Sequence, residues 1–447
     1  MTDKKRRRFI PFITTSITED LCMAILLIPV WWFLGIRFFI FHLTALLITI
    51  KLFSQKRKNS QKILFPSELY MLSGFILIYI LSLLINSPHI PIWRFFASLN
   101  NLSFWVMGIL LIFTVYNSTS KEDIEKLLKP LRNFALITSA FVLPVFTYAI
   151  IANKYISIPS LLKNLLPKNL LQLINIQAPL LYTHISLTII GKSRLFHINP
   201  IQRAKGFNLW GTTFSGTMCL LIAMTLAYYW NKKKKKELAF ILSLEFFAIF
   251  TAISRNFIWL FLSLAVVLLI VYLKKSLLLK LGPYVLIFLF LFFLLIPLNQ
   301  VKNTLINVRK QSFQWRLELY KITFNGAIEK PILGHGYKPH PQKYPTTIAS
   351  HSTYLGVLYK TGFVGLFFFL LFWIAVLRKW WSQKILFKEN KSGYPLWFFS
   401  GVAFIYGLLW MIGEDLDVPP ILAFIYFLIV GITLSLSKLQ ESTSQKK

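Results

Sequence analysis

The chain alternates between long apolar runs and short polar connections from one end to the other. We expect each run to form a membrane-spanning helix, because the hydrocarbon core of a bilayer takes about 20 helical residues to cross. The twelve predicted spans comprise residues 21–34, 38–53, 65–85, 99–116, 134–151, 207–230, 238–253, 257–273, 281–298, 354–377, 396–412 and 418–436. The strand-like alternation of a barrel is missing, so the pattern predicts an all-α polytopic membrane protein with about 12 transmembrane helices.

Two long polar intervals interrupt this pattern. An outer segment, residues 153–205, lies between the fifth and sixth spans, and a large loop, residues 299–353, lies between the ninth and tenth. The pattern divides the chain into three regions. Residues 1–298 hold spans one to nine, residues 299–353 form a loop that covers the site, and residues 354–447 hold spans ten to twelve and a short cytoplasmic tail. Leucine-rich pieces of the outer segment, such as SLLKNLLPKNLLQLI, predict short helices lying on the membrane surface.

The distribution of basic residues predicts the orientation of the chain in the membrane. The formal net charge is +33, and clusters such as residues 4–8 and 232–236 recur in alternate connections, as in cytoplasmic loops of membrane proteins. We therefore expect both termini in the cytoplasm and both long intervals on the outer face. No basic face with stacking aromatics lies on a soluble module, so nucleic acid is not an expected partner.

Composition agrees with a membrane location. Hydrophobic residues make up 56% of the chain, and the mean hydropathy is +0.61. The two cysteines, Cys22 and Cys219, lie in apolar runs, so no disulfide framework is expected. Residues 4–8 precede the first run as in a signal peptide, but no small-residue cleavage site follows, and we expect an uncleaved span.

Three arginines from separate segments fall at the outer mouth in this topology: Arg203, Arg255 and Arg316. A guanidinium group offers a fork of donors that matches two phosphate oxygens, so three of them near the interface could hold a pyrophosphate. Each alone could instead contact lipid headgroups, and Arg316 could pair with Glu318 or Glu329. Arg255 lies in a tight turn between two apolar runs, which favours a function.

Three histidines, His335, His340 and His351, lie in the polar interval 315–365. His351 precedes the tenth span, with Ser350 as the expected helix cap, so its imidazole could accept a proton from an attacking hydroxyl at the membrane boundary. The three histidines could instead bind zinc, but no carboxylate or second histidine has helical ligand spacing. Walker, HExxH and GxSxG motifs are also missing, and we expect no metal ion and no cofactor.

The chain resembles the O-antigen ligase family of membrane glycosyltransferases in four stretches. These are RAKGFNLWGTTFSGTM, the SRN turn, WRLELYKITFNGAIEKPILGHG and SHSTYLGVLYKTGFVG, and GEDLDVPPILAF is similar to the ligase ending. The detailed resemblance covers residues 203–377. It implies a GT-C-like bundle of about twelve transmembrane helices in the bacterial inner membrane, with a large periplasmic loop between helices nine and ten.

The resemblance also implies a reaction and its residues. A glycan on undecaprenyl pyrophosphate is passed to a sugar hydroxyl of lipid A-core in lipopolysaccharide assembly, with inversion and without metal, at a periplasmic active site. Position by position, Arg203 and Arg255 match pyrophosphate-contacting arginines, and His351 matches the histidine proposed to activate the acceptor. Arg316 matches the loop arginine, which we assign both to the pyrophosphate and to catalysis. The implied partners are the lipid-linked donor, the lipid A-core acceptor and the lipid bilayer. The chain departs from the family at Lys360. The family often has an acidic residue at this position, so the sign of the charge is inverted.

Two alternative functions stay open at the level of sequence. An O-antigen polymerase shares the arginines but uses a second lipid-linked glycan as acceptor, and the histidine in ASHSTYLG with the acidic final turn favours a ligase. A flippase or transporter of lipid-linked glycans should line a cavity with charges at mid-membrane depth, whereas mid-span charges here are chiefly Glu245 and Lys360. His335, His340 and Lys360 are secondary candidates for the site.

Overall fold

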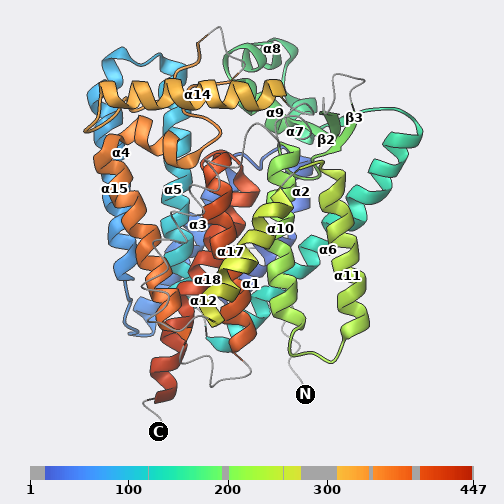
Figure 1. The fold of residues 1–447 in the computed structure, drawn as a ribbon, viewed down its shortest axis with the longest axis vertical. Coiled ribbons are helices and arrows are strands. Elements are labelled where there is room, and N and C mark those ends of the chain that lie inside the picture. The colour runs from blue at the N-terminus through green and yellow to red at the C-terminus, as the bar shows by residue number, and fades with distance from the viewer. Residues whose placement is uncertain are drawn as a thin grey trace, which may run out of the picture.

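The computed structural model describes residues 16–118, 120–193, 201–254, 256–272, 310–341, 346–384 and 393–444. These ranges are mainly helical, and most of the helices stand side by side in a bundle (Figure 1). Helix α14 (Lys310–Glu329) lies across one end of the bundle, and the C-terminal end of α18 (Pro420–Ser444) lies at the opposite end. We call the end that carries α14 the outer end.

Seven of the described helices are long and apolar enough to cross a membrane. They are α4 (Ser67–Asn86), α5 (Ile92–Ser118), α6 (Lys121–Ile151), α10 (Gly211–Tyr229), α15 (Thr353–Ser382), α17 (Tyr394–Gly413) and α18. An eighth span results if α1 (Ile17–Leu26) and α2 (Ile28–Leu34), which are bent by 53° at their junction, count as one. A multi-pass membrane protein is therefore confirmed.

The other predicted spans fall into two groups. Spans 38–53, 238–253 and 257–273 coincide with α3 (Ile40–Lys58), α11 (Lys235–Thr251) and α12 (Asn256–Tyr272). Helix α3 ends in three basic residues, and α11 and α12 have 17 residues each, so these helices are more charged or shorter than the seven. The predicted span 281–298 lies outside the described residues.

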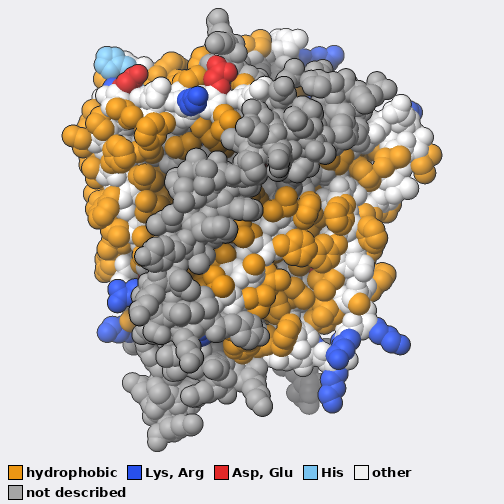
Figure 2. Space-filling model, in the orientation of Figure 1, with side chains coloured by type: hydrophobic (Ala, Val, Ile, Leu, Met, Phe, Trp, Pro, Cys, Tyr) orange, Lys and Arg blue, Asp and Glu red, His pale blue; other side chains and the backbone are white. Residues whose placement is uncertain are grey.

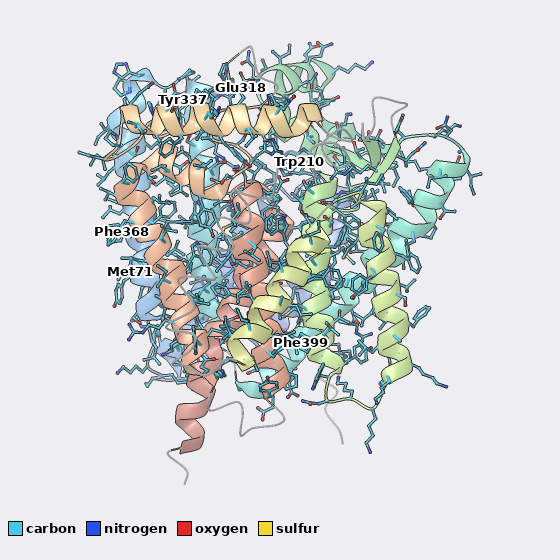
Figure 3. All side chains as sticks on the ribbon, viewed as in Figure 1. Met71, Trp210, Glu318, Tyr337, Phe368 and Phe399 are labelled. Atoms are coloured by element: carbon cyan, nitrogen blue, oxygen red, sulfur yellow. The ribbon has the colours of Figure 1, made fainter. Side chains whose placement is uncertain are left out.

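Helix α18 forms the centre of the bundle and is completely buried over its membrane-length segment. It packs mainly against α5 and α17, and α4 packs along α15. Apolar side chains point outward around the flanks, where Phe247 is 63% exposed and Phe367 is 58% exposed (Figure 2). Figure 3 shows Met71 and Phe368 on the flank of the α4–α15 pair. Such a broad apolar surface is suited to contact with lipid chains.

The outer segment contains a three-stranded antiparallel sheet that the sequence did not predict. Strands β1 (Ile156–Pro159), β2 (Ser186–Ser193) and β3 (Ile201–Ala204) lie in the order β1-β2-β3. The expected short helices are confirmed as α7 (Leu161–Leu165), α8 (Lys168–Gln177) and α9 (Pro179–Ile185), and η1 (Ser87–His89) follows α4. Strand β3 leads into α10, so it places its side chains at the outer end of the bundle.

Helix α15 is kinked at Gly362, where φ is 64° and ψ is −168°. The kink leaves the carbonyls of Tyr359 and Lys360 without helical partners, and the loop 331–336 supplies them. Two backbone N–H groups of this loop donate to these carbonyls at 2.9 Å each, while the N–H of Phe363 donates to a loop carbonyl at 2.7 Å. The loop thus repairs the hydrogen bonds that the kink breaks.

Three glycines make this close contact between backbones feasible. Gly334, Gly336 and Gly362 all have positive φ, a conformation that costs little only for glycine. A Cβ atom at Gly334 would lie 2.6 Å from the backbone nitrogen of Gly362, and one at Gly362 would lie 2.2 Å from the carbonyl oxygen of Ile332. Gly334 and Gly362 therefore form one packed junction, which joins the loop after α14 to α15, while Gly336 packs against the backbone of α4.

Candidate functional site

The turn between α17 and α18 carries three carboxylates, and each faces a cation from another segment. Glu414 accepts from Arg316 at 3.2 Å, Asp415 accepts from Lys338 at 2.9 Å, and Asp417 pairs with Lys360. The side chains of Lys338, Lys360 and Asp417 are at most 8% exposed. Three carboxylates thus balance three cations, which is what the burial of charged groups demands.

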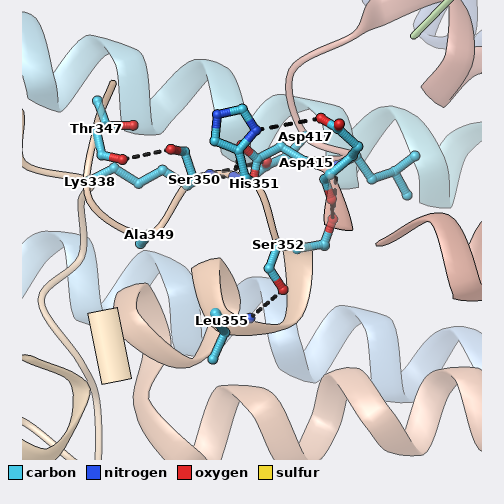
Figure 4. A network of polar contacts seen from close by, with 12 residues as sticks. Lys338, Thr347, Ala349, Ser350, His351, Ser352, Leu355, Asp415 and Asp417 are labelled. Carbon is cyan, nitrogen blue, oxygen red and sulfur yellow. Dashed lines mark hydrogen bonds and ion pairs between the residues drawn. The ribbon is translucent and has the colours of Figure 1, made fainter. Parts of the chain in front are cut away.

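His351 lies against this acidic turn, as Figure 4 shows. Its Nδ1 atom is 3.7 Å from Oε2 of Glu414, an electrostatic contact longer than a hydrogen bond. Its backbone N–H donates to Oδ2 of Asp415 at 3.1 Å, and its carbonyl accepts from the Tyr320 hydroxyl at 2.6 Å. The edge of the Trp315 indole completes the surroundings, with ring centroids 5.5 Å apart. Side chains from two further elements therefore hold the backbone of His351 on both sides.

The backbone of His351 has φ of 62°, in the left-handed region that non-glycine residues seldom adopt. This conformation belongs to the turn before α15, in which Ala349 also has a positive φ of 64°, and the helix begins only at Thr353. The N-cap is consequently Ser352, whose hydroxyl accepts from the N–H of Leu355, and the expectation of Ser350 as the cap is wrong. The hydroxyl of Ser350 instead donates to the carbonyl of Thr347 at 2.7 Å. Strain of this kind persists where surrounding contacts enforce it.

The electrostatics of the pair Arg316 and Glu414 keep both groups charged. Burial alone would raise the pKa of Glu414, but the neighbouring His351 ring and the Arg316 guanidinium hold it below its ordinary value. Burial alone would lower the pKa of Arg316, but Glu414 raises it above its ordinary value. Arg316 also donates to the carbonyl of Gly413 at 3.1 Å. An ionised Glu414 at Nδ1 stabilises a positive charge on the His351 ring.

Tyr320 is fixed as a hydrogen-bond donor. Burial raises its pKa to about 12, and the carboxylates of Glu414 and Asp415 add to the rise although Arg316 opposes it. The hydroxyl therefore stays protonated at neutral pH and continues to donate to His351. The side chain of His351 is 25% exposed, so its ring can still be reached from outside.

Arg203 lies on β3, where it contacts the helices next to the sheet. Its Nε donates to the carbonyl of Ala252 at 2.6 Å, and its guanidinium packs over Gly211 at the first turn of α10. Arg255 lies outside the described residues. The next residue, Asn256, donates to the Thr212 carbonyl at 2.6 Å, which anchors the start of α12 to the same turn of α10.

The secondary candidates have structural partners. Nε2 of His335 lies 2.7 Å from the carbonyl oxygen of Gly326, and its ring stacks on Tyr359 with centroids 4.4 Å apart. His340 is exposed on the same loop. Lys360 is 1% exposed and lies in the ion pair with Asp417. Across the described ranges, no three His, Cys, Asp or Glu side chains are grouped as ligands of one metal ion.

Part of the chain is similar to a known family. Residues 238–370 match the family model described as O-antigen ligase. The resemblance to the O-antigen ligase family is confirmed. The match includes Arg316 and His351 and covers less than a third of the chain, and no curated protein matches the chain. The O-antigen ligase family comprises ligases and related polymerases, and it implies a glycosyltransferase-like activity on lipid-linked glycans in a membrane.

Sequence reasoning missed the partners of His351. Glu414 and Asp415 lie beyond the part of the chain that matches the O-antigen ligase family, and Tyr320 lies within it. The acidic turn itself stood out by its composition, but its contact with His351 did not. Three of the 16 acidic residues of the chain fall within four positions, at 414–417, in a turn between two apolar runs. Carboxylates at such a place need partners, and only the fold identifies them.

Proposed function

We propose that the protein is an O-antigen ligase, which transfers a glycan from undecaprenyl pyrophosphate to a sugar hydroxyl of lipid A-core. The observation that carries the proposal is the His351 ring, clamped between α14 and the acidic turn with its Nδ1 facing Glu414. A histidine next to a carboxylate and open on its other side is suited to general-base catalysis near neutral pH.

In the proposed reaction, a proton on Nδ1 faces Glu414, which leaves the lone pair of Nε2 for the acceptor. As the acceptor oxygen forms its bond to the anomeric carbon, Nε2 of His351 takes the hydroxyl proton. The bond between the anomeric carbon and the pyrophosphate oxygen breaks, and undecaprenyl pyrophosphate leaves with that electron pair. Attack from the face opposite the leaving group inverts the configuration at the anomeric carbon. Glu414 stabilises the imidazolium that results.

The arginines would neutralise the leaving group. Two nitrogens of Arg316 are occupied by Glu414 and Gly413, so its remaining N–H donors would face the pyrophosphate. Arg203 would contact the pyrophosphate from β3, and Arg255 is proposed for the same role from its turn. Positive side chains aimed at the developing negative charge supply the stabilisation for which other enzymes use a metal ion.

The proposal includes a topology. We infer a GT-C-like bundle of twelve spans in the bacterial inner membrane, with both termini in the cytoplasm and the site on the periplasmic face. The cluster of lysines at 232–236 and the C-terminal end of α18 lie at the end of the bundle opposite α14 (Figures 1 and 2). Basic residues favour the cytoplasmic side, so this distribution supports a periplasmic α14.

The experiment is complementation of a ligase deletion strain with His351→Ala, read from the lipopolysaccharide profile on gels. We expect loss of the O-antigen ladder at normal protein abundance, because general-base catalysis is worth about 10²–10⁴-fold in rate. His340→Ala is the matched control, since that histidine is exposed on the same loop. An undiminished ladder with His351→Ala would contradict the proposed mechanism.

The same strain distinguishes the alternatives. Long lipid-linked glycans should accumulate when a ligase is absent, whereas core capped with a single repeat would indicate an O-antigen polymerase. Loss of glycan from the periplasmic leaflet itself would indicate a flippase. A flippase would need charged groups within the membrane, such as Glu245. This side chain accepts a hydrogen bond from Thr225 at 2.8 Å, between α10 and α11.

A further inference from the structure

A second group of cations, Arg37, Arg203 and Lys205, lies around the start of α10. Arg37 is 2% exposed in the turn between α2 and α3, and it donates to the carbonyls of Phe207 at 2.6 Å and Thr183 at 3.3 Å. The bond to Phe207 fixes the backbone two residues after Lys205. Lys205 directly follows β3, and its N–H continues the ladder by donating to the carbonyl of Ile189 at 2.8 Å. An extended backbone therefore directs the side chains of Arg203 and Lys205 to the same face.

The ammonium group of Lys205 lies close to the sheet. A Cβ atom on Gly191 of β2 would meet Cε of Lys205 at 2.7 Å and its Nζ at 3.3 Å. Gly191 is also the residue that pairs with Arg203 across the β2–β3 ladder. The glycine therefore leaves the space in which the lysine crosses the sheet beside Arg203.

Lys205 and Arg37 have no carboxylate to balance them within the described ranges. No Asp or Glu occurs between Glu125 and Glu237 in the sequence. Within the described ranges, the ammonium of Lys205 forms no hydrogen bond or ion pair, and Arg37 has no carboxylate within ion-pair distance. Burial and the like charges of Arg203 and Arg37 lower the pKa of Lys205, and burial lowers that of Arg37 to about 9.

At the acidic turn between α17 and α18, by contrast, each cation has a carboxylate partner. Like charges that are partly buried together repel, and the cost falls when an anion binds between them. The positive end of α10 begins at Gly211, against which Arg203 packs, and Trp210 marks this end in Figure 3. The missing negative charge at this place would come from a ligand.

We propose that Lys205 is a further substrate-binding residue, which contacts a phosphate of the donor pyrophosphate beside Arg203. The proposal rests on the proposed function for the identity of the donor. Its chemistry is the binding of a phosphate or pyrophosphate anion, which the donor, the phosphates of a lipid A acceptor and bilayer headgroups all share. We assign the site to the donor because Arg203 is proposed for the same pyrophosphate.

Binding is tested with the purified full-length protein in nanodiscs of neutral lipid, with inorganic pyrophosphate as the probe. Lys205→Gln should weaken pyrophosphate binding about tenfold or more, since a charge-assisted hydrogen bond is lost, and Lys205→Arg should retain most of it. Lys154→Gln, an exposed lysine of the same outer segment, should bind as the wild type does. Equal affinity of Lys205→Gln and the wild type, at equal thermal stability without ligand, overturns the proposal.

Two further measurements identify the source of the phosphate. In a transfer assay, Lys205→Gln should raise the KM for the lipid-linked donor and leave the KM for the acceptor unchanged. A rise in the acceptor KM alone, or loss of pyrophosphate binding when phosphatidylglycerol is added to the nanodiscs, would overturn the assignment to the donor. A wild type that binds pyrophosphate through Lys205 yet transfers no glycan would contradict only the proposed function.

Discussion

His351 and Glu414 face each other at 3.7 Å although 62 residues and two membrane helices separate them in the chain. The contact joins the beginning of α15 to the turn between α17 and α18. Because Arg316 of α14 pairs with the same carboxylate, three elements meet at one side chain. This makes Glu414 the residue whose removal should separate the proposed base from its electrostatic support.

Glu414→Gln should lower kcat about tenfold or more while protein abundance is unchanged. The amide keeps the shape of the side chain but loses the charge that stabilises an imidazolium at His351. Glu329→Gln, which alters an exposed carboxylate at the end of α14, should leave kcat unchanged. Equal kcat values for the two variants, measured with purified protein, would remove Glu414 from the mechanism.

Tyr320→Phe should lower both thermal stability and kcat. The change removes the 2.6 Å hydrogen bond to the carbonyl of His351, which is worth about 1 kcal/mol, and releases a backbone in the left-handed region. Tyr148→Phe alters a tyrosine that is 57% exposed and serves as the control. If Tyr320→Phe has the activity of the wild type, the hydroxyl is not needed to position His351.

Gly362→Ala should destabilise the protein by about 1–3 kcal/mol. A methyl group there would lie 2.2 Å from the carbonyl of Ile332 and would sit on a residue with φ of 64°. Gly413→Ala is the matched control for stability, since a Cβ atom at that position meets nothing within 4 Å. Thermal unfolding in detergent compares the two, and equal midpoints would show that the junction tolerates a side chain.

Lys360→Met should destabilise the protein by about 3–5 kcal/mol, because it leaves the carboxylate of Asp417 buried next to Lys338 alone. Combining it with Asp417→Asn should recover part of the loss, since both partners of the pair are then neutral. A double variant less stable than Lys360→Met would show that Asp417 does not depend on Lys360. Unfolding midpoints of the three proteins provide the measurement.

Stability should fall in acid partly through Glu414. The pKa of this carboxyl is lowered in the folded protein, so its contribution is fully present above the ordinary glutamate value of about 4.3 and is lost as pH falls through the lower folded value. The unfolding midpoint of the wild type should therefore drop more steeply below about pH 4 than that of Glu414→Gln. Parallel curves for the two proteins would contradict an ionised, stabilising Glu414.

Much of the bundle could be predicted from the sequence, because the length of an apolar run determines a span whatever the helix packs against. A kink within such a run leaves no trace in hydropathy, so the break at Gly362 was missed. The small sheet was missed because the leucine-rich pieces around it have a helical pattern, and because β1 and β3 have only four residues each.

The candidate site was only half predictable. Arg316 and His351 could be chosen by their chemistry and by the resemblance, since both stand in a polar interval beside a span. Their common partner could not, because the side chain that Glu414 faces depends on how α14, α15 and α17 pack. Sequence spacing suggested partners for Arg316 on its own helix, whereas the carboxylate that it contacts comes from the α17–α18 turn.

The junction at Gly362 limits how the outer loop can move. Backbone hydrogen bonds and interlocked glycines tie the loop 331–336 to both halves of α15, while Asn86 of α4 donates to the carbonyl of Gly334 at 3.2 Å. The described part of the loop is therefore fixed to two membrane helices, α4 and α15, and cannot open as a lid. In the proposed reaction, two lipid-anchored substrates would then have to enter sideways from the bilayer, toward a His351 that is already held in place.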